Sequence, residues 1–268
     1  HEYNLTYLKS LRKKFRSGIL KCVTIPHTAP SWTTIFSGVT PEIHGVYEFA
    51  TVIPGDRYTI AWNRPGARPI RRLDIKARFI WEELNAKGLK VKVLSVPCTL
   101  PTLSYNCPER KGELRHIFFP DKKEEIEDCI KIHEKIIPLI LKQELDLFIT
   151  VLPLPDKILH LKPNESNFLS RVQNYLQVHK INKKIFHIDW LRNLQQRYLR
   201  AQLLARMDKM IKKILPEDEP FMILSDHGEP LPSSFYKLKS YRILIPTHRS
   251  EGVIITNIEG YLPKTNIE

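Results

Sequence analysis

A threonine hydroxyl near the N-terminus lies between two prolines, in a segment whose residue types could support covalent catalysis. Residues 25–49 read IPHTAPSWTTIFSGVTPEIHGVYEF, and a short β-branched run at 23–25 precedes Thr28. Proline fixes φ and biases the residue before it away from the helical region. We therefore expect Thr28 to be held in one pose at the end of a strand, as a nucleophile requires.

A carboxylate and an imidazole follow the apolar run 145–153. Asp156 and His160 have the i, i+4 spacing that places both side chains on one face of a helical turn. A surface ion pair is the simpler interpretation of this spacing taken alone. The ends of strands are, however, where open α/β sheets present their ligands.

Two further clusters lie next to apolar runs that are typical of buried strands. Asp226 and His227 directly follow the run 221–225, and His248 precedes the run 253–257. A single histidine at such a place is usually a surface residue. The adjacent acid and imidazole after a buried run are harder to explain as structural residues.

Together these residues supply most of the ligands of a two-metal centre. Carboxylate and imidazole ligands favour Zn²⁺ or Mn²⁺ over Mg²⁺ or Ca²⁺. One metal would lower the pKa of the Thr28 hydroxyl, and the pair would stabilise the attacking and leaving oxygens of an in-line displacement. We therefore expect two divalent cations as cofactors, with zinc as the first choice and manganese as the second.

The order of the motifs along the chain resembles one known superfamily. TAPSW and GVTPEIHG are followed by DKILH, SDHG and HRSEG. This series looks like the alkaline phosphatase superfamily, and within it the type I phosphodiesterase/nucleotide pyrophosphatase family in its archaeal and bacterial form. The resemblance extends from about residue 4 to residue 257.

The resemblance implies a role for each matching residue. Thr28 would be the nucleophile and would form a covalent phosphothreonine that water later hydrolyses. One metal would be bound by Asp156, His160 and His248, and the other by Asp226, His227 and the Thr28 oxygen. His44, in the PEIHG turn, would be a structural residue that orients the loop behind the nucleophile.

Two departures from the family pattern affect these expectations. Ser31 stands where eukaryotic nucleotide pyrophosphatases have an Asn that binds a phosphate oxygen, and serine has less reach. The family's first strand ends in Asp-Gly, whose Asp is a metal ligand, but no Asp-Gly precedes Thr28. Either an N-terminal strand is missing from this chain, which is the interpretation we favour, or the protein is a natural short form with an impaired metal site.

The activity that the resemblance implies is metal-dependent hydrolysis of phosphodiester or phosphoanhydride bonds in nucleotides or similar small anionic molecules. A phosphomonoesterase or a phosphonate hydrolase of the same superfamily is one alternative. A catalytically inactive member that binds nucleotides or another anionic ligand is a second, favoured by the absent Asp-Gly. We expect substrate selection to depend on residues 57–69 and 100–115.

Helical and apolar segments alternate along the chain, which indicates an α/β fold. Strands are expected at 89–97, 145–153, 221–225 and 253–257, and helices at 75–84 after an Asp74 cap, at 124–141 and at 190–215. The last helix has one apolar face made of Leu191, Leu194, Tyr198, Leu204, Met207 and Ile211. Continuous apolar strands favour a mostly parallel sheet with helices on both faces. The resemblance implies an alkaline-phosphatase-like three-layer sandwich that lacks the usual first strand, and we expect residues 1–268 to form a single domain.

The composition narrows the classes of protein. The chain of 268 residues has a formal net charge of +13, which suits an anionic substrate. Its basic residues are dispersed and not interleaved with aromatics, which argues against a nucleic-acid-binding module. No apolar run reaches the ~18 residues of a membrane span and the N-terminus is not a signal peptide, so we expect a cytoplasmic protein. The cysteines at 22, 98, 107 and 129 are expected to be free thiols, with a Cys98–Cys107 bridge as the alternative.

Overall fold

A central strand, β5 (Glu251–Thr256), pairs with β1 (Arg16–Lys21) on one side and with β4 (Met222–Leu224) on the other. These strands belong to a computed structural model that describes residues 3, 5–22, 26–49, 69–99, 122–161, 188–229 and 248–260. Both pairings are antiparallel. The prediction of a mostly parallel sheet is therefore wrong for these strands, because a continuous apolar run indicates burial on both faces and leaves the strand direction open.

Two further strands, β2 (Val91–Leu94) and β3 (Leu147–Thr150), form a parallel pair, as their apolar runs predict. The register places Val91 opposite Leu147 and Leu94 opposite Thr150. Parallel strands need a crossover connection, and α6 (Lys123–Leu141) lies between these two in the chain. α6 continues through Pro138 as one helix.

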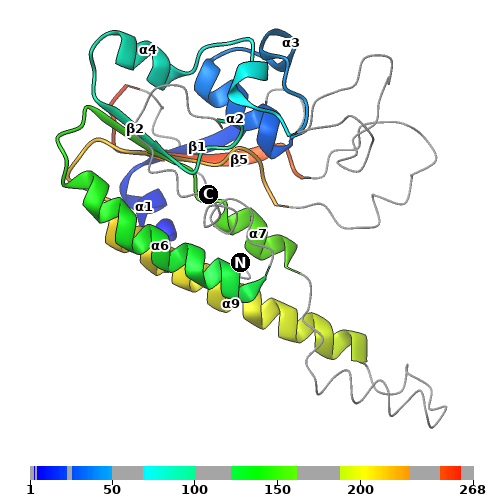
Figure 1. The fold of residues 1–268 in the computed structure, drawn as a ribbon. Helices are drawn as coiled ribbons and strands as arrows, with labels where there is room; N and C mark the ends of the chain where they lie inside the picture. Colours follow the sequence, from blue (N-terminus) through cyan, green and yellow to red (C-terminus); the bar gives the residue numbers. More distant parts are fainter. Residues whose placement is uncertain are drawn as a thin grey trace, which may run out of the picture.

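Helices cover both faces of the strands, as predicted (Figure 1). On one face lie α1 (Thr6–Lys14), α6, α7 (Leu154–His160) and α9 (Ile188–Ile214), and on the other lie α2 (Thr28–Ser37), α3 (Pro41–His44) and α4 (Ile80–Ala86). Each helical layer has its own buried apolar cluster, the first including Leu11, Ile130 and Leu203 and the second including Trp32, Phe79 and Val93. Burial of this apolar surface holds the strands between the two layers.

The helix predicted directly after Asp74 begins later in the chain. Arg72–Asp74 form a short 3-10 helix, η1, and the Asp74 carboxylate accepts the backbone N–H of Arg71 at 2.8 Å. Asp74 therefore stabilises this turn, and α4 starts only at Ile80. The predicted end holds, because the chain turns at Gly88 with a φ of 84° that favours glycine.

Thr28 is the first residue of a helix and does not end a strand. α2 starts at Thr28, with His27 in an extended conformation before it, and the run 23–25 lies outside the described residues. Pro30 is accommodated because the N–H groups of the first helical turn have no partner within the helix. The two prolines therefore frame a helix start, which also holds the hydroxyl in a defined place.

The predicted apolar face of α9 is buried only in its C-terminal half. Leu204, Met207 and Ile211 are buried, whereas Leu194 is 50% and Tyr198 66% exposed. Figure 1 shows the N-terminal half of α9 extending past the end of α6. Periodicity predicts the helix correctly, but it cannot show where the neighbouring helices end.

A carboxylate from α9 caps the start of α1. Asp208 is 4% exposed and accepts the backbone N–H groups of Tyr7 at 2.8 Å and Leu8 at 2.9 Å. These groups have no acceptor within α1 because they lie in its first turn. The two helices are thus joined by charge-assisted hydrogen bonds as well as by apolar contacts.

Three cysteines are free thiols, namely Cys22, Cys98 and Cys129, so the alternative bridge from Cys98 is wrong. Cys107 and the segment 100–115 lie outside the described residues, as does all of 57–69 except Pro69. Within the described ranges, no helix combines the length and apolar character needed to cross a bilayer.

Candidate metal centre and active site

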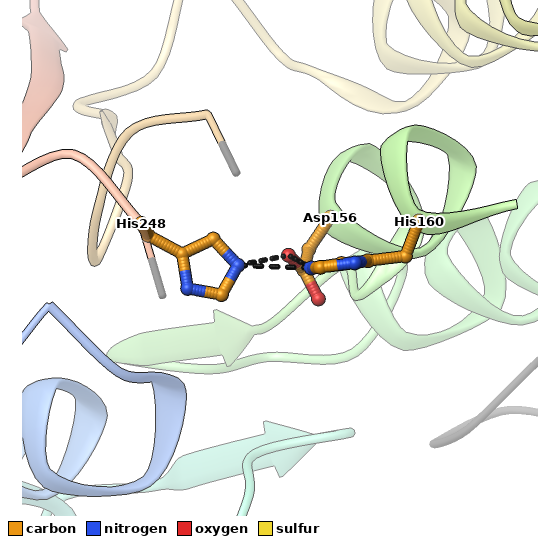
Figure 2. Close-up of side chains that lie close together, drawn as sticks. All are labelled: Asp156, His160 and His248. Atoms are coloured by element: carbon orange, nitrogen blue, oxygen red, sulfur yellow. Dashed lines mark hydrogen bonds and ion pairs between the residues drawn. The ribbon is translucent and has the colours of Figure 1, made fainter. Parts of the chain in front are cut away.

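Asp156, His160 and His248 form a compact group of side chains that can bind a metal (Figure 2). Their candidate ligand atoms all lie within 4.8 Å of one another. Asp156 Oδ1 is 3.0 Å from His248 Nε2 and 3.2 Å from His160 Nε2. The structure therefore brings together the three residues predicted for one metal.

Helix α7 positions two members of this group. Leu154 and Ile158, spaced i, i+4, are fully buried and anchor one face of the helix in the core. Asp156 and His160 have the same spacing and lie within hydrogen-bonding distance of each other. The apolar pair therefore fixes the direction in which the acid and the imidazole point.

Asp226, His227 and Thr28 form a second group. His227 Nδ1 lies 3.0 Å from the carbonyl oxygen of Gly228, which can only accept, so the neutral ring carries its proton on Nδ1. Nε2 then has a lone pair, and it lies 3.0 Å from Thr28 Oγ1 and 3.3 Å from Asp226 Oδ2. The Thr28 hydroxyl donates to this nitrogen.

Antiparallel pairing of β4 with β5 brings the two groups together. Beyond the end of β4, the Gly228 N–H donates to the Arg249 carbonyl at 2.9 Å, which continues the strand pairing past the paired strands. His227 and His248 consequently stack, with ring centroids 4.0 Å apart. The predicted ligands thus converge through a pairing that the expected parallel sheet would not have produced.

Two glycines permit this close approach. A Cβ on Gly228 would lie 2.7 Å from the Glu251 carbonyl oxygen, and a Cβ on Gly252 would overlap the Ser225 carbonyl oxygen. Real Cβ atoms do not approach backbone oxygens so closely. Any larger residue at either position would push β4 and β5 apart next to His227.

His44 supports the nucleophile helix from behind. The ring is fully buried, Nδ1 accepts the backbone N–H of Val46 at 3.0 Å, and Nε2 lies 3.0 Å from the Thr34 hydroxyl. Since Nδ1 accepts, the neutral ring donates from Nε2 to Thr34. His44 therefore joins α3 to α2 through its hydrogen bond to Thr34.

Ser31 lies one helical turn after Thr28 and is buried. Its hydroxyl donates to Cys22 Sγ at 3.9 Å, and Cys22 Sγ donates to the Asp226 carbonyl oxygen at 2.7 Å. Burial raises the pKa of Cys22. Sequence reasoning placed Ser31 near the substrate but missed Cys22, which carries no motif.

His27 and Glu48 are also near the site, and sequence reasoning assigned them no role. His27 Nε2 lies 3.2 Å from Glu48 Oε1, and the side chains are 20% and 11% exposed. Burial, together with His248 and His227, lowers the pKa of His27 to about 4. The sequence does contain one signal for this pair: a histidine directly before Thr28 and an acid, Glu48, near the end of the segment 25–49.

The pKa values of the two carboxylates of the site are shifted in opposite directions. Burial alone would raise the pKa of Asp156, but hydrogen bonds and positive charge from His160 and His248 outweigh it and hold the pKa well below its ordinary value. Burial raises the pKa of Asp226 to about 6, and the charge of Asp156 adds to this effect while His227 opposes it. A cation beside Asp226 would therefore stabilise its ionised form, which burial disfavours.

The donors of the second group fit a divalent cation. Asp226 Oδ2 is buried and has no hydrogen-bond partner within the described residues. Asp226 Oδ2 lies 3.3 Å from His227 Nε2. When the neutral His227 ring carries its proton on Nδ1, neither of these two atoms has a proton to donate to the other. Two acceptors so close together are stabilised by a shared cation, and carboxylate with imidazole suits Zn²⁺ or Mn²⁺.

A mixed α/β chain that gathers two carboxylates, three imidazoles and a hydroxyl in one place has the donors of a metal-dependent phosphoester hydrolase. Residues 2–234 match the type I phosphodiesterase/nucleotide pyrophosphatase family, and the chain belongs to that family. His248 lies beyond the matched residues, so its place in the site rests on the geometry.

One similar solved structure is the phosphonoacetate hydrolase from Sinorhizobium meliloti 1021 in complex with phosphonoacetate. It is 12% identical, has a TM-score of 0.45, and the match covers 84% of this chain and 51% of the hydrolase chain. The chain thus spans about half the length of that enzyme. A sequence search of curated proteins finds no match.

Proposed function

We propose that this chain hydrolyses phosphodiester or phosphoanhydride bonds in nucleotides or similar small anionic molecules, through a covalent intermediate on Thr28. Its family membership supports the phosphoester class of substrate. The net charge of +13 suits an anionic substrate. The observation that carries the proposal is the position of Thr28 Oγ1, 3.0 Å from His227 Nε2 and next to the buried Asp226.

Each proposed residue has a separate task. Asp156, His160 and His248 would hold one divalent cation, and Asp226, His227 and the Thr28 oxygen would hold the other. When bound, Zn²⁺ or Mn²⁺ would lower the pKa of the Thr28 hydroxyl and stabilise charge on the attacking and leaving oxygens. Ser31, one turn along α2, would donate to a phosphoryl oxygen.

The reaction takes two displacements at phosphorus. Thr28 Oγ forms a bond to phosphorus while the bond from phosphorus to the leaving oxygen breaks, and the Thr28 proton balances the charge on the leaving group. Water then adds to phosphorus, the bond to Oγ breaks, and a proton from the water restores the hydroxyl. The fixed pose of Thr28 at the start of α2 supports the first displacement.

Thr28 variants test the proposal. With Zn²⁺ or Mn²⁺ and bis-p-nitrophenyl phosphate, we expect turnover by the wild type, a loss of several orders of magnitude in Thr28→Ala, and partial activity in Thr28→Ser, which keeps the hydroxyl. Intact-mass measurement after acid quench should detect Thr28 carrying a p-nitrophenyl phosphoryl group in the wild type, because one of the two p-nitrophenol groups leaves in the first displacement, and no such adduct in Thr28→Ala. Equal turnover by wild type and Thr28→Ala would refute the proposal.

Parallel substrates separate the alternatives. Faster hydrolysis of p-nitrophenyl phosphate would indicate a phosphomonoesterase, and faster hydrolysis of p-nitrophenyl phenylphosphonate would indicate a phosphonate hydrolase. Nucleotide binding by calorimetry without turnover of any substrate would indicate a non-catalytic family member.

A further inference from the structure

His27 is fixed next to the nucleophile by contacts on two sides. It precedes Thr28 in the chain, and its Nε2 lies 3.2 Å from Glu48 Oε1. The ring also meets the edge of Phe49, with centroids 5.4 Å apart and an interplanar angle of 67°. Glu48 and Phe49 follow α3, and His44 within α3 contacts Thr34. Residues 44–49 therefore hold the start of α2 through His27 and its later part through Thr34.

The position of Glu48 favours one tautomer of the His27 ring. Glu48 Oε1 accepts the backbone N–H of Phe49 at 2.9 Å and lies 3.2 Å from His27 Nε2, so its negative charge favours the neutral ring that carries its proton on Nε2. Nδ1 of the neutral ring then has a lone pair. A carboxylate that fixes the tautomer of a histidine in this way makes the opposite nitrogen an acceptor of defined direction.

His27 Nδ1 is shielded from solvent and has no hydrogen-bond partner within the described ranges. A buried acceptor without a partner costs about 1–3 kcal/mol, and a catalytic role or a bound water is among the reasons for a structure to keep one. Phosphoryl oxygens carry lone pairs and cannot donate to it. Beside Thr28, the reactant that carries an O–H group is the water that hydrolyses the phosphothreonine.

We propose that His27 Nδ1 accepts a hydrogen bond from the hydrolytic water and positions it for the second displacement, with Glu48 holding the ring. In that step the water oxygen bonds to phosphorus, the bond from phosphorus to Thr28 Oγ breaks, and a water proton restores the Thr28 hydroxyl. This inference rests on the proposed covalent mechanism. It adds a residue that acts on breakdown of the intermediate and not on its formation.

Two variants disrupt the proposed contact between His27 Nδ1 and the hydrolytic water in different ways. His27→Phe keeps a planar ring but has no nitrogen. Glu48→Gln removes the negative charge beside Nε2, and its amide group can donate to Nε2 as well as accept from it, so the ring no longer has one favoured tautomer. Glu42→Gln is the matched control, because Glu42 is an exposed acid in the neighbouring helix α3.

Rapid-quench kinetics with bis-p-nitrophenyl phosphate and Mn²⁺ separate the two steps. We expect both variants to keep the rapid burst of p-nitrophenol, and to lose roughly 100-fold in the rate of dephosphorylation, as for a misplaced reactant. The phosphothreonine intermediate, which retains one p-nitrophenyl group with this substrate, should accumulate in both variants by intact mass. Mn²⁺ content and thermal midpoint should match the wild type, and Glu42→Gln should behave as the wild type throughout.

Other outcomes identify which idea fails. If the burst and the steady-state rate fall together, or if phosphothreonine does not accumulate, the role of His27 in the second step is wrong. If Mn²⁺ content falls in His27→Phe, the ring supports the metal site and the inference is again wrong. If the wild type itself forms no phosphothreonine, the proposed covalent function fails before His27 is tested.

Discussion

At the scale of single residues, the buried carboxyl of Asp226 depends most on what binds beside it. Its Oδ2 atom has no hydrogen-bond partner within the described residues, and burial raises its pKa to about 6. The buried Asp226 carboxylate therefore lowers the stability of the folded protein at a place where a cation can bind. A carboxylate retained under such a penalty is more typical of a functional site than of a structural one.

Asp226→Asn should stabilise the protein when no cation is present. Between pH 4 and pH 6 the folded protein binds more protons at this group than the unfolded chain does, so the free energy of unfolding falls as pH rises through that range. At pH 8 the variant should therefore be more stable by up to roughly 3 kcal/mol, and the difference should vanish below pH 4. Urea unfolding at both pH values measures it.

Mn²⁺ should reverse the order at pH 8, because cation binding stabilises only a protein that holds its ligands. The wild type should gain stability with Mn²⁺, and Asp226→Asn should gain less. Asp218→Asn, at an exposed position, serves as the control and should follow the wild type. If Asp226→Asn is less stable than the wild type in metal-free buffer at pH 8, then burial of the ionised Asp226 carboxylate does not destabilise the protein.

At the scale of elements, the contact between β4 and β5 determines the geometry of the site. The pairing continues past Leu224 toward Gly228, and it brings His227 against His248. Gly252 is the residue at which the strands could not remain so close with a side chain. The separation of the two proposed metal sites therefore depends on backbone packing as well as on the ligands.

Gly252→Ala should displace β5 from the end of β4, because the added Cβ would overlap the Ser225 carbonyl oxygen. We expect a loss of about 1–3 kcal/mol in the free energy of unfolding and weaker Mn²⁺ binding by calorimetry. Ser250→Ala, at an exposed position two residues earlier, should change neither quantity. Unchanged Mn²⁺ affinity in Gly252→Ala would show that the ligands do not depend on this strand contact.

Much of the candidate site could be predicted because its residues follow strands or share a helical face. The spacing of Asp156 and His160 predicts their contact, and the apolar run 221–225 predicts β4 and so places Asp226 and His227 just beyond the end of a strand. The antiparallel direction of β5 could not be predicted, because apolar runs carry no information on strand direction. His27 and Glu48 were missed because their pairing depends on how the chain returns after α3.

At the scale of the whole molecule, α9 has two halves with different roles. Its C-terminal half contributes Leu203, Met207 and Met210 to the core shared with α1, α6 and α7. Its N-terminal half extends past α6 and carries exposed apolar side chains at Leu194 and Tyr198 (Figure 1). Stability should therefore depend on only one part of this helix.

Two leucines on α9 form a matched test. Leu203 is 1% exposed and Leu194 is 50% exposed. Leu203→Ala should cost about 2–5 kcal/mol through the cavity it leaves, and Leu194→Ala should stay within about 0.5 kcal/mol of the wild type. Chemical denaturation measures both, and a large loss in Leu194→Ala would show that the overhanging half of α9 is packed in solution.

The Asp208 cap on α1 can form only late in the synthesis of the chain. The carboxylate that accepts the Tyr7 N–H lies 201 residues later in the chain. At about 5–20 residues per second, a ribosome adds that length of chain in roughly 10–40 s. During this interval the first turn of α1 has no Asp208 acceptor, and its apolar face lacks the helix α9 that later covers it. Helix α1 therefore lacks both this cap and this cover until α9 has been synthesised.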